Sequence, residues 1–193
     1  ATSFTLHQLA YHPAAQQKVH EEIDAVLSKY NNKLCYDAVK EMTYLEWTFK
    51  EAMRMFPSLG FLIRECAKKF TFPEIDLTID EGVVVMIPVQ ALHNDPKYFQ
   101  NPDEFRPERF SPEEFQSVEK FVYLPFGAGP RACIGERLGQ MQSLAGLAGV
   151  LARCEVAPGP STLRVPRVHP ASDIVQCIRG GLPLRFIPRT PKP

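Results

Sequence analysis

The chain has 193 residues, and its 22 basic side chains balance 22 acidic ones, so the formal net charge is zero. This balance gives no electrostatic reason to expect a nucleic acid as partner. Hydrophobic residues make up 45% and charged residues 23%, a globular composition that excludes a disordered chain. No apolar run approaches the ~20 residues that cross a membrane. Because the first residue is not Met and the opening residues already resemble mid-helix sequence, we expect a fragment of a larger domain.

The amino-terminal part of the chain predicts helices, because only Pro13 interrupts it. Pro13 suits the first turn of a helix that runs to about Lys29. Another helix starts near Thr43 and stops before Pro57, since a residue that precedes proline avoids the helical conformation. Thr43 and Glu46 have the Thr-x-x-Glu spacing of a capping box. This helix is apolar on most of its faces, which indicates that it is buried.

The middle of the chain favours strands and then a long loop. Between residues 61 and 88 the apolar residues alternate loosely, and 83–87 is a β-branched run. Asp80-Glu81-Gly82 is a turn signal just before that run. Residues 94–125 carry prolines at short intervals and predict a loop. A loop of this length in a compact chain usually has a function.

The last third of the chain predicts one long helix and then short strands. A proline-free stretch leaves room for a helix from about Ile134 to Cys154. Residues 165–175 and 182–187 have the pattern of short strands. The sequence therefore predicts a mainly α chain with small β-sheets, of the α+β class, that forms part of a single domain over residues 1–193.

The five cysteines are odd in number and lack Cys-x-x-Cys spacing, so they indicate neither a zinc ribbon nor a disulfide framework. We expect reduced thiols in a protein that faces the cytosol. One of them, Cys133, follows a glycine-rich loop at the predicted start of the long helix. Unpaired amides and the helix macrodipole favour a thiolate there, and Arg131 adds a positive charge. Gly127 and Gly129 allow the backbone to approach a flat or bulky group closely.

Three interpretations of this loop compete. In the first, Cys133 is a buried structural cysteine. In the second, the G-x-G-x-x-A pattern of the loop is a dinucleotide fingerprint with Glu155 as its ribose-binding acid. Against this, Pro125 sits where the preceding strand should be, and Pro130 removes an amide from the phosphate-binding turn. In the third, Cys133 is a thiolate ligand of haem iron. Composition alone leaves all three open.

A second pattern lies on the predicted buried helix, where Glu51 and Arg54 share one face. On a surface such a pair contributes about 0–1 kcal/mol, but this helix leaves little polar face. Buried charges need partners that offset their desolvation. The long loop supplies a candidate in Arg109, so we expect a buried Glu–Arg–Arg cluster that ties the loop to the helix and has an architectural role.

Taken together, these residues resemble the cytochrome P450 family. Its haem-ligand signature, F-x-x-G-x-R-x-C-x-G, is matched at every defined position by Phe126, Gly129, Arg131, Cys133 and Gly135. Glu51 and Arg54 match its E-x-x-R helix, 105–110 matches its Pro-Glu-Arg-Phe segment, and 91–96 matches the segment upstream. Four motifs in the family's order argue against the dinucleotide interpretation. The resemblance covers essentially the whole chain, whereas the chain covers less than half of the family's fold, namely its C-terminal portion.

The resemblance implies a haem b cofactor, with Cys133 as the proximal thiolate ligand of the iron. Arg131 and Arg64 would pair with the haem propionates, a role that bidentate guanidinium groups suit, and His93 is a weaker candidate. Phe126 would pack beside the haem and shield the sulfur. The implied haem-binding residues are Cys133, Arg131, Arg64, Phe126, Gly127, Gly129, Gly135 and His93. The implied structural cluster consists of Glu51, Arg54 and Arg109.

The resemblance also implies a substrate and partners. The sequence is most similar to microsomal members, among them insect detoxification and vertebrate drug-metabolising enzymes. Such enzymes insert one oxygen atom from O2 into a lipophilic substrate, with electrons from NADPH that arrive through NADPH–P450 reductase. An N-terminal helix anchors them on the cytosolic face of the endoplasmic reticulum membrane. The implied substrate-lining residues, all apolar, are Leu59, Phe61, Leu62, Ile63, Ile174 and Val175.

The family's oxygen-activating acid–threonine pair has no counterpart in this sequence. Thr2 and Thr5 lie too close to the start of the chain, on the wrong side of the expected position. We therefore assign no catalytic residue, and we expect that the isolated 193 residues bind haem weakly at best and do not catalyse oxygenation. The alternative to a monooxygenase fragment is a truncated, non-catalytic product that folds partly, or binds haem or reductase without turnover.

Overall fold

The computed structural model describes residues 1–116, 121–170, 172 and 175–190. Of the described residues, 44% are helical when 3-10 turns are included, and the sheets are small and antiparallel, which confirms the predicted α+β class. The helices are α1 (Thr2–Tyr11), α2 (Pro13–Lys29), α3 (Tyr36–Glu41), α4 (Thr43–Met55), α5 (Val89–His93), α6 (Pro112–Phe115) and α7 (Glu136–Leu151). The strands are β1 (Leu62–Glu65), β2 (Phe70–Phe72), β3 (Leu77–Ile79), β4 (Val84–Ile87), β5 (Cys154–Pro158) and β6 (Leu184–Pro188). Among the described residues, no helix combines the length and the apolar character needed to span a membrane.

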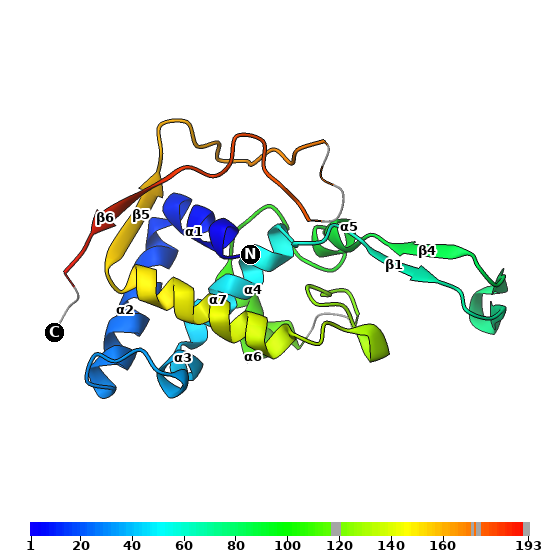
Figure 1. The fold of residues 1–193 in the computed structure, drawn as a ribbon, viewed down its shortest axis with the longest axis horizontal. Helices are drawn as coiled ribbons and strands as arrows, with labels where there is room; N and C mark the ends of the chain where they lie inside the picture. Colours follow the sequence, from blue (N-terminus) through cyan, green and yellow to red (C-terminus); the bar gives the residue numbers. More distant parts are fainter. Residues whose placement is uncertain (117–120, 171, 173–174, 191–193) are drawn as a thin grey trace.

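The longer helices gather in one body, and paired strands extend from it on two sides (Figure 1). β1 pairs with β4 in a ribbon that reaches away from the helices, with Leu62 opposite Ile87 and Glu65 opposite Val84. β2 pairs with β3 within the segment that joins those two strands. β5 pairs with β6 on the other side of the body. The ribbon places β1 next to the loop that precedes α7.

Apolar side chains place α4 in the core of the helical body. Leu45, Phe49, Ala52 and Met53 are buried in a cluster to which α1, α2 and α7 also contribute. Each large apolar side chain buried in this way stabilises the fold by about 1.5–3 kcal/mol. The predicted burial of this helix is confirmed, and the same helix carries Glu51 and Arg54 into the interior.

The helix that follows the cysteine loop is shorter than predicted. α7 covers Glu136–Leu151 rather than 134–154, and Gly135 is its N-terminal capping residue. Cys154 instead begins β5, whose backbone pairs with β6. Because the absence of proline permits either structure, the proline-free stretch could not place the end of the helix.

The carboxy-terminal segment forms one strand where two were predicted. The range 182–187 corresponds to β6, but 165–175 forms no strand among its described residues and takes part only in isolated β-bridges. Pro166 and Pro170 explain this difference, because proline cannot donate a ladder hydrogen bond. The loop just before this range is hydrogen-bonded to α1 through the carbonyl oxygens of Thr162 and Leu163 (Figure 1).

A carboxylate from a neighbouring helix caps α4, and the predicted capping box is wrong. Thr43 is the first helical residue, and its hydroxyl makes no capping hydrogen bond. Instead, the Glu22 carboxylate on α2 accepts hydrogen bonds from the amides of Tyr44 at 2.7 Å and Leu45 at 2.8 Å. Amides in the first turn have no intrahelical acceptor. Burial raises the pKa of Glu22, and these hydrogen bonds oppose that rise.

Replacing Glu22 with glutamine is expected to lower the free energy of unfolding by about 1–2 kcal/mol, because hydrogen bonds to a charged cap are stronger than those to a neutral one. Urea unfolding of the full-length protein that carries this chain measures the change. Thr43→Ala is the matched comparison and should cost less than about 0.5 kcal/mol. If Thr43→Ala lowered the unfolding free energy more than Glu22→Gln, the capping box would be correct after all.

Candidate functional site

The loop before α7 closes on itself and presents Cys133. The Cys133 amide donates a hydrogen bond to the carbonyl oxygen of Phe126 at 2.8 Å, and the Ala132 amide donates to that of Gly129 at 3.0 Å. Gly127 and Gly129 both have φ near +74°, a left-handed conformation that other residues rarely adopt. These glycines permit the chain reversal that brings Cys133 back beside Phe126.

Cys133 lies just before α7 rather than within it. It precedes the capping residue Gly135 by two positions, and its side chain is exposed. Exposure contradicts the interpretation of Cys133 as a buried structural cysteine. A Cβ atom at position 135 would lie 4.0 Å from the Cys133 sulfur, an ordinary van der Waals contact.

Large apolar side chains lie on both sides of this loop. Ile134 is fully exposed, and Leu138 in the first turns of α7 is 72% exposed. From β1, the Cδ1 atom of Leu62 lies 3.8 Å from the point where Gly127 would carry a Cβ atom. Phe126 is partly buried and packs against the core. Exposed apolar surface gathered at one place is typical of a binding site.

Two arginines from distant parts of the chain meet at the loop. The Arg64 guanidinium on β1 donates to the carbonyl oxygen of Arg131 at 3.5 Å and to that of Ile63 at 2.8 Å. Within the described ranges, neither Arg64 nor Arg131 forms an ion pair with a carboxylate. Guanidinium groups bind carboxylates through paired hydrogen bonds, so this surface suits an anionic group.

The predicted Glu–Arg–Arg cluster comes together in the interior. The side chains of Glu51 and Arg54 are completely buried, and that of Arg109 is 6% exposed. Glu51 accepts hydrogen bonds from Arg54 at 2.7 and 3.0 Å, from Arg109 at 3.2 Å and from the Arg106 amide at 3.0 Å. Both arginines also donate to backbone carbonyl oxygens of the long loop. The cluster therefore ties that loop to α4.

The residues at the loop fit a haem group. An exposed thiol is the donor that haem-thiolate iron takes, the exposed apolar side chains suit the flat ring, and Arg64 and Arg131 suit its propionates. The described residues hold no group of three or more histidine, cysteine, aspartate or glutamate side chains that could bind a metal ion instead.

Comparison with known proteins supports this assignment, because residues 1–179 match the family described as cytochrome P450. The chain belongs to the cytochrome P450 family. It is 38% identical over 184 residues to the probable cytochrome P450 6a13 of Drosophila melanogaster and 36% identical over 187 residues to cytochrome P450 6B6 of Helicoverpa armigera. It is 41% identical over 184 residues to cytochrome P450 6j1 of Blattella germanica.

These P450 alignments cover 95%, 97% and 95% of the chain but only 37%, 37% and 36% of the three relatives. The chain thus spans somewhat more than a third of the length of the curated relatives it matches. The fold argues independently against the dinucleotide interpretation. A dinucleotide fingerprint follows a strand of a parallel sheet, whereas every sheet in the described part is antiparallel and residues 121–125, just before the loop, form no strand.

His93, the weaker candidate for a propionate, lies in the interior. Its ring is completely buried next to Phe99 and Tyr123, and its Nε2 atom accepts a hydrogen bond from the Leu124 amide at 2.8 Å. Burial is the main cause that lowers the pKa of His93 to about 4, and the positive charge of Arg54 acts in the same direction. A buried and neutral ring is a poorer partner for a propionate than Arg64 or Arg131, which lie at the loop.

This lowered pKa predicts acid lability. The unfolded chain binds a proton at His93 near the usual pKa of 6.5, whereas the folded chain resists protonation down to about pH 4. Stability contributed by the neutral ring is therefore complete above about pH 6.5 and is lost as the pH falls toward 4. We expect a loss of about 2 kcal/mol in unfolding free energy between about pH 7 and pH 5.

Urea unfolding at each pH, compared between wild type and His93→Gln, isolates this contribution because glutamine does not titrate. The neighbouring groups do not titrate in this range either: Arg54 stays charged, and burial raises the pKa of Tyr123 well above 10. If the unfolding free energy of the two proteins changed equally with pH, the prediction would be contradicted.

The two predicted substrate-lining segments lie side by side. Leu59 and Val175 form an antiparallel β-bridge, and the Gln176 amide donates to the carbonyl oxygen of Ser58 at 3.1 Å. A contact that sequence analysis missed adds to this, because Nε2 of Gln176 donates to Oε1 of Gln90 at 2.6 Å. No local sequence pattern predicts this contact, because Gln90 and Gln176 lie far apart in the chain.

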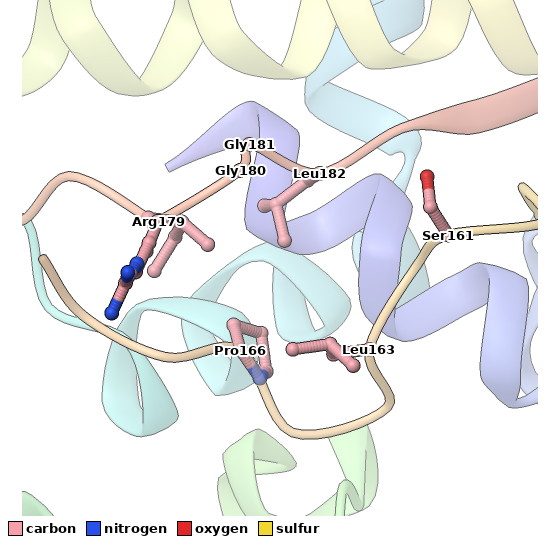
Figure 2. A pocket seen from close by; sticks show the side chains of 8 residues that line it. Ser161, Leu163, Pro166, Arg179, Gly180, Gly181 and Leu182 are labelled. Atoms are coloured by element: carbon pink, nitrogen blue, oxygen red, sulfur yellow. The ribbon is translucent and has the colours of Figure 1, made fainter.

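The remaining predicted substrate-lining residues differ in exposure. Phe61 and Leu62 are partly buried, Ile63 is 50% exposed, and Ile174 lies outside the described residues. A separate cavity of about 300 Å³ lies within the carboxy-terminal loop (Figure 2). It is lined by Ser161, Leu163, Pro166, Ile178, Arg179, Gly180, Gly181 and Leu182. Of the predicted haem-binding and substrate-lining residues that the structure describes, none belongs to this lining.

Proposed function

We propose that the protein that carries this chain is a haem-thiolate monooxygenase, which inserts one oxygen atom from O2 into a lipophilic substrate. The observation that carries the proposal is the exposed Cys133 thiol, held in a loop that closes on the Phe126 carbonyl oxygen and lies beside Arg64 and Arg131. Membership of the P450 family supports haem b as the cofactor.

The residues of the loop have separate tasks. Cys133 holds the iron as a thiolate, Arg64 and Arg131 bind the propionates, and Phe126 packs beside the ring and shields the sulfur. Gly127, Gly129 and Gly135 let the backbone approach the ring closely. When bound, the haem supplies the redox chemistry that activates O2, and the protein contributes binding, orientation and the exclusion of water.

The partners follow from the similarity to microsomal members of the family. Electrons come from NADPH through NADPH–P450 reductase, and the enzyme lies on the cytosolic face of the endoplasmic reticulum membrane. The apolar side chains of Leu59, Phe61, Leu62 and Val175 support a lipophilic substrate. We assign no oxygen-activating acid or threonine within residues 1–193, so these residues by themselves do not catalyse oxygenation.

The test uses the full-length protein that carries this chain, purified and reconstituted with NADPH–P450 reductase. We expect one haem per chain, a thiolate-type ferrous–CO spectrum, and NADPH-dependent incorporation of one atom of labelled O2 into a lipophilic probe. Haem binding without incorporation across a panel of such probes would favour the non-catalytic alternative. Oxygenation by residues 1–193 alone would contradict the statement that they are not sufficient.

A further inference from the structure

One buried histidine connects the interior of the protein to the start of the Cys133 loop. His93 ends α5, and its ring centroid lies 5.1 Å from that of Tyr123 and 6.5 Å from that of Phe99. Its backbone carbonyl oxygen accepts a hydrogen bond from the Arg54 guanidinium at 2.9 Å. His93 is therefore anchored to the buried charge cluster on α4.

The side chain of the same residue holds the segment that leads into the loop. Its Nε2 atom accepts the Leu124 amide at 2.8 Å, and the Leu124 carbonyl oxygen accepts the Gly127 amide at 3.1 Å. Two residues after Leu124, the carbonyl oxygen of Phe126 accepts the Cys133 amide at 2.8 Å. These hydrogen bonds, joined by the backbone between Leu124 and Phe126, connect His93 to Cys133, the candidate iron ligand.

The hydrogen bond to Leu124 distinguishes histidine from other aromatic residues at this position. Because Nε2 accepts, the hydrogen of the neutral ring is on Nδ1. Phenylalanine would fill the same aromatic cluster next to Phe99 and Tyr123. What phenylalanine lacks is the acceptor that the buried Leu124 amide needs.

We propose that His93 is a positioning residue for the haem-thiolate loop, because its Nε2 atom fixes the Leu124 amide and thereby sets where Cys133 lies relative to the buried Glu51–Arg54 pair. The proposal rests on the proposed function, since it assumes that Cys133 is the iron ligand. It gives His93 an indirect role, through the backbone of another residue, and no contact with haem or substrate.

The test compares two substitutions of His93 in the full-length protein. His93→Gln keeps an acceptor near the Nε2 position, whereas His93→Phe keeps an aromatic ring and removes the acceptor. Tyr123→Phe is the matched control, because it lies in the same aromatic cluster and loses only the hydrogen bond from its hydroxyl to the Lys50 carbonyl oxygen at 3.0 Å. The readouts are hydrogen exchange of the Leu124 amide and the fraction of haem that shows the thiolate-type ferrous–CO band.

We expect His93→Phe to speed exchange at Leu124 by about tenfold and to lower the thiolate-type fraction. His93→Gln should restore most of both signals, and Tyr123→Phe should change neither, even if its melting temperature falls. The proposal is overturned if exchange at Leu124 is unchanged in His93→Phe, or if all three variants lose the thiolate band equally. A wild-type protein that protects Leu124 but shows no thiolate band would overturn the proposed function, and the role of His93 with it.

Discussion

Replacing Cys133 with serine is expected to remove the thiolate-type ferrous–CO band completely while the fold is retained. The side chain is exposed, and the substitution exchanges one atom, so the unfolding free energy of the haem-free protein should change by no more than about 0.5 kcal/mol. A serine hydroxyl stays protonated near neutral pH and cannot provide the anionic sulfur that gives haem-thiolate iron its electronic character. The spectrum should therefore change while the stability does not.

The matched control is Cys35→Ser, which changes another exposed cysteine that also lies just before a helix, α3. The measurement is haem content together with the ferrous–CO spectrum of the full-length protein. Both should be unchanged in the control. If Cys133→Ser kept the thiolate-type band, Cys133 could not be the ligand, and the proposed function would lose the observation that carries it.

Replacing Glu51 with glutamine is expected to lower the free energy of unfolding by about 3–5 kcal/mol, because it removes a carboxylate that neutralises two buried guanidinium groups. Glu51 is completely buried and accepts hydrogen bonds from Arg54, Arg109 and the Arg106 amide. Glutamine would also turn an amide donor toward these donors. Because Glu51 would no longer hold the two arginines, the long loop should detach from α4.

Glu46→Gln on the same helix is the control, since Glu46 pairs with Lys50 at 2.6 Å on the surface. Surface pairs contribute about 0–1 kcal/mol, so this change should be small. Urea unfolding of both full-length variants gives the comparison, and proteolysis within residues 94–110 reports whether the loop is released. Equal costs for the two substitutions would show that the buried cluster does not hold the loop.

Several parts of the site could be predicted from the sequence because their signals are local. The left-handed turns at Gly127 and Gly129 need residues without a side chain, and Cys133 and Arg131 lie within the same few residues. The burial of α4 follows from apolar residues on most of its faces. Such signals rest on conformational preference and periodicity, which a short stretch of sequence contains in full.

Other features had no local signal. The short helix α3 was not predicted, and Thr43 was the predicted cap of α4, although the acceptor is Glu22 on another helix. His93 was a weaker candidate for a haem propionate, whereas the fold carries that ring into the interior against Leu124. In each case the deciding partner lies in a different element of the structure.

The sequence by itself therefore determined the helical body, the glycine-rich cysteine loop and the identity of the charged cluster. Only the tertiary structure decided how these parts are joined: Arg64 beside Arg131, Leu59 beside Val175, and His93 at the entrance of the loop. The physical reason is that a buried amide or charge must find a partner. Which partner it finds depends on how distant segments pack, and that packing is not contained in any local pattern.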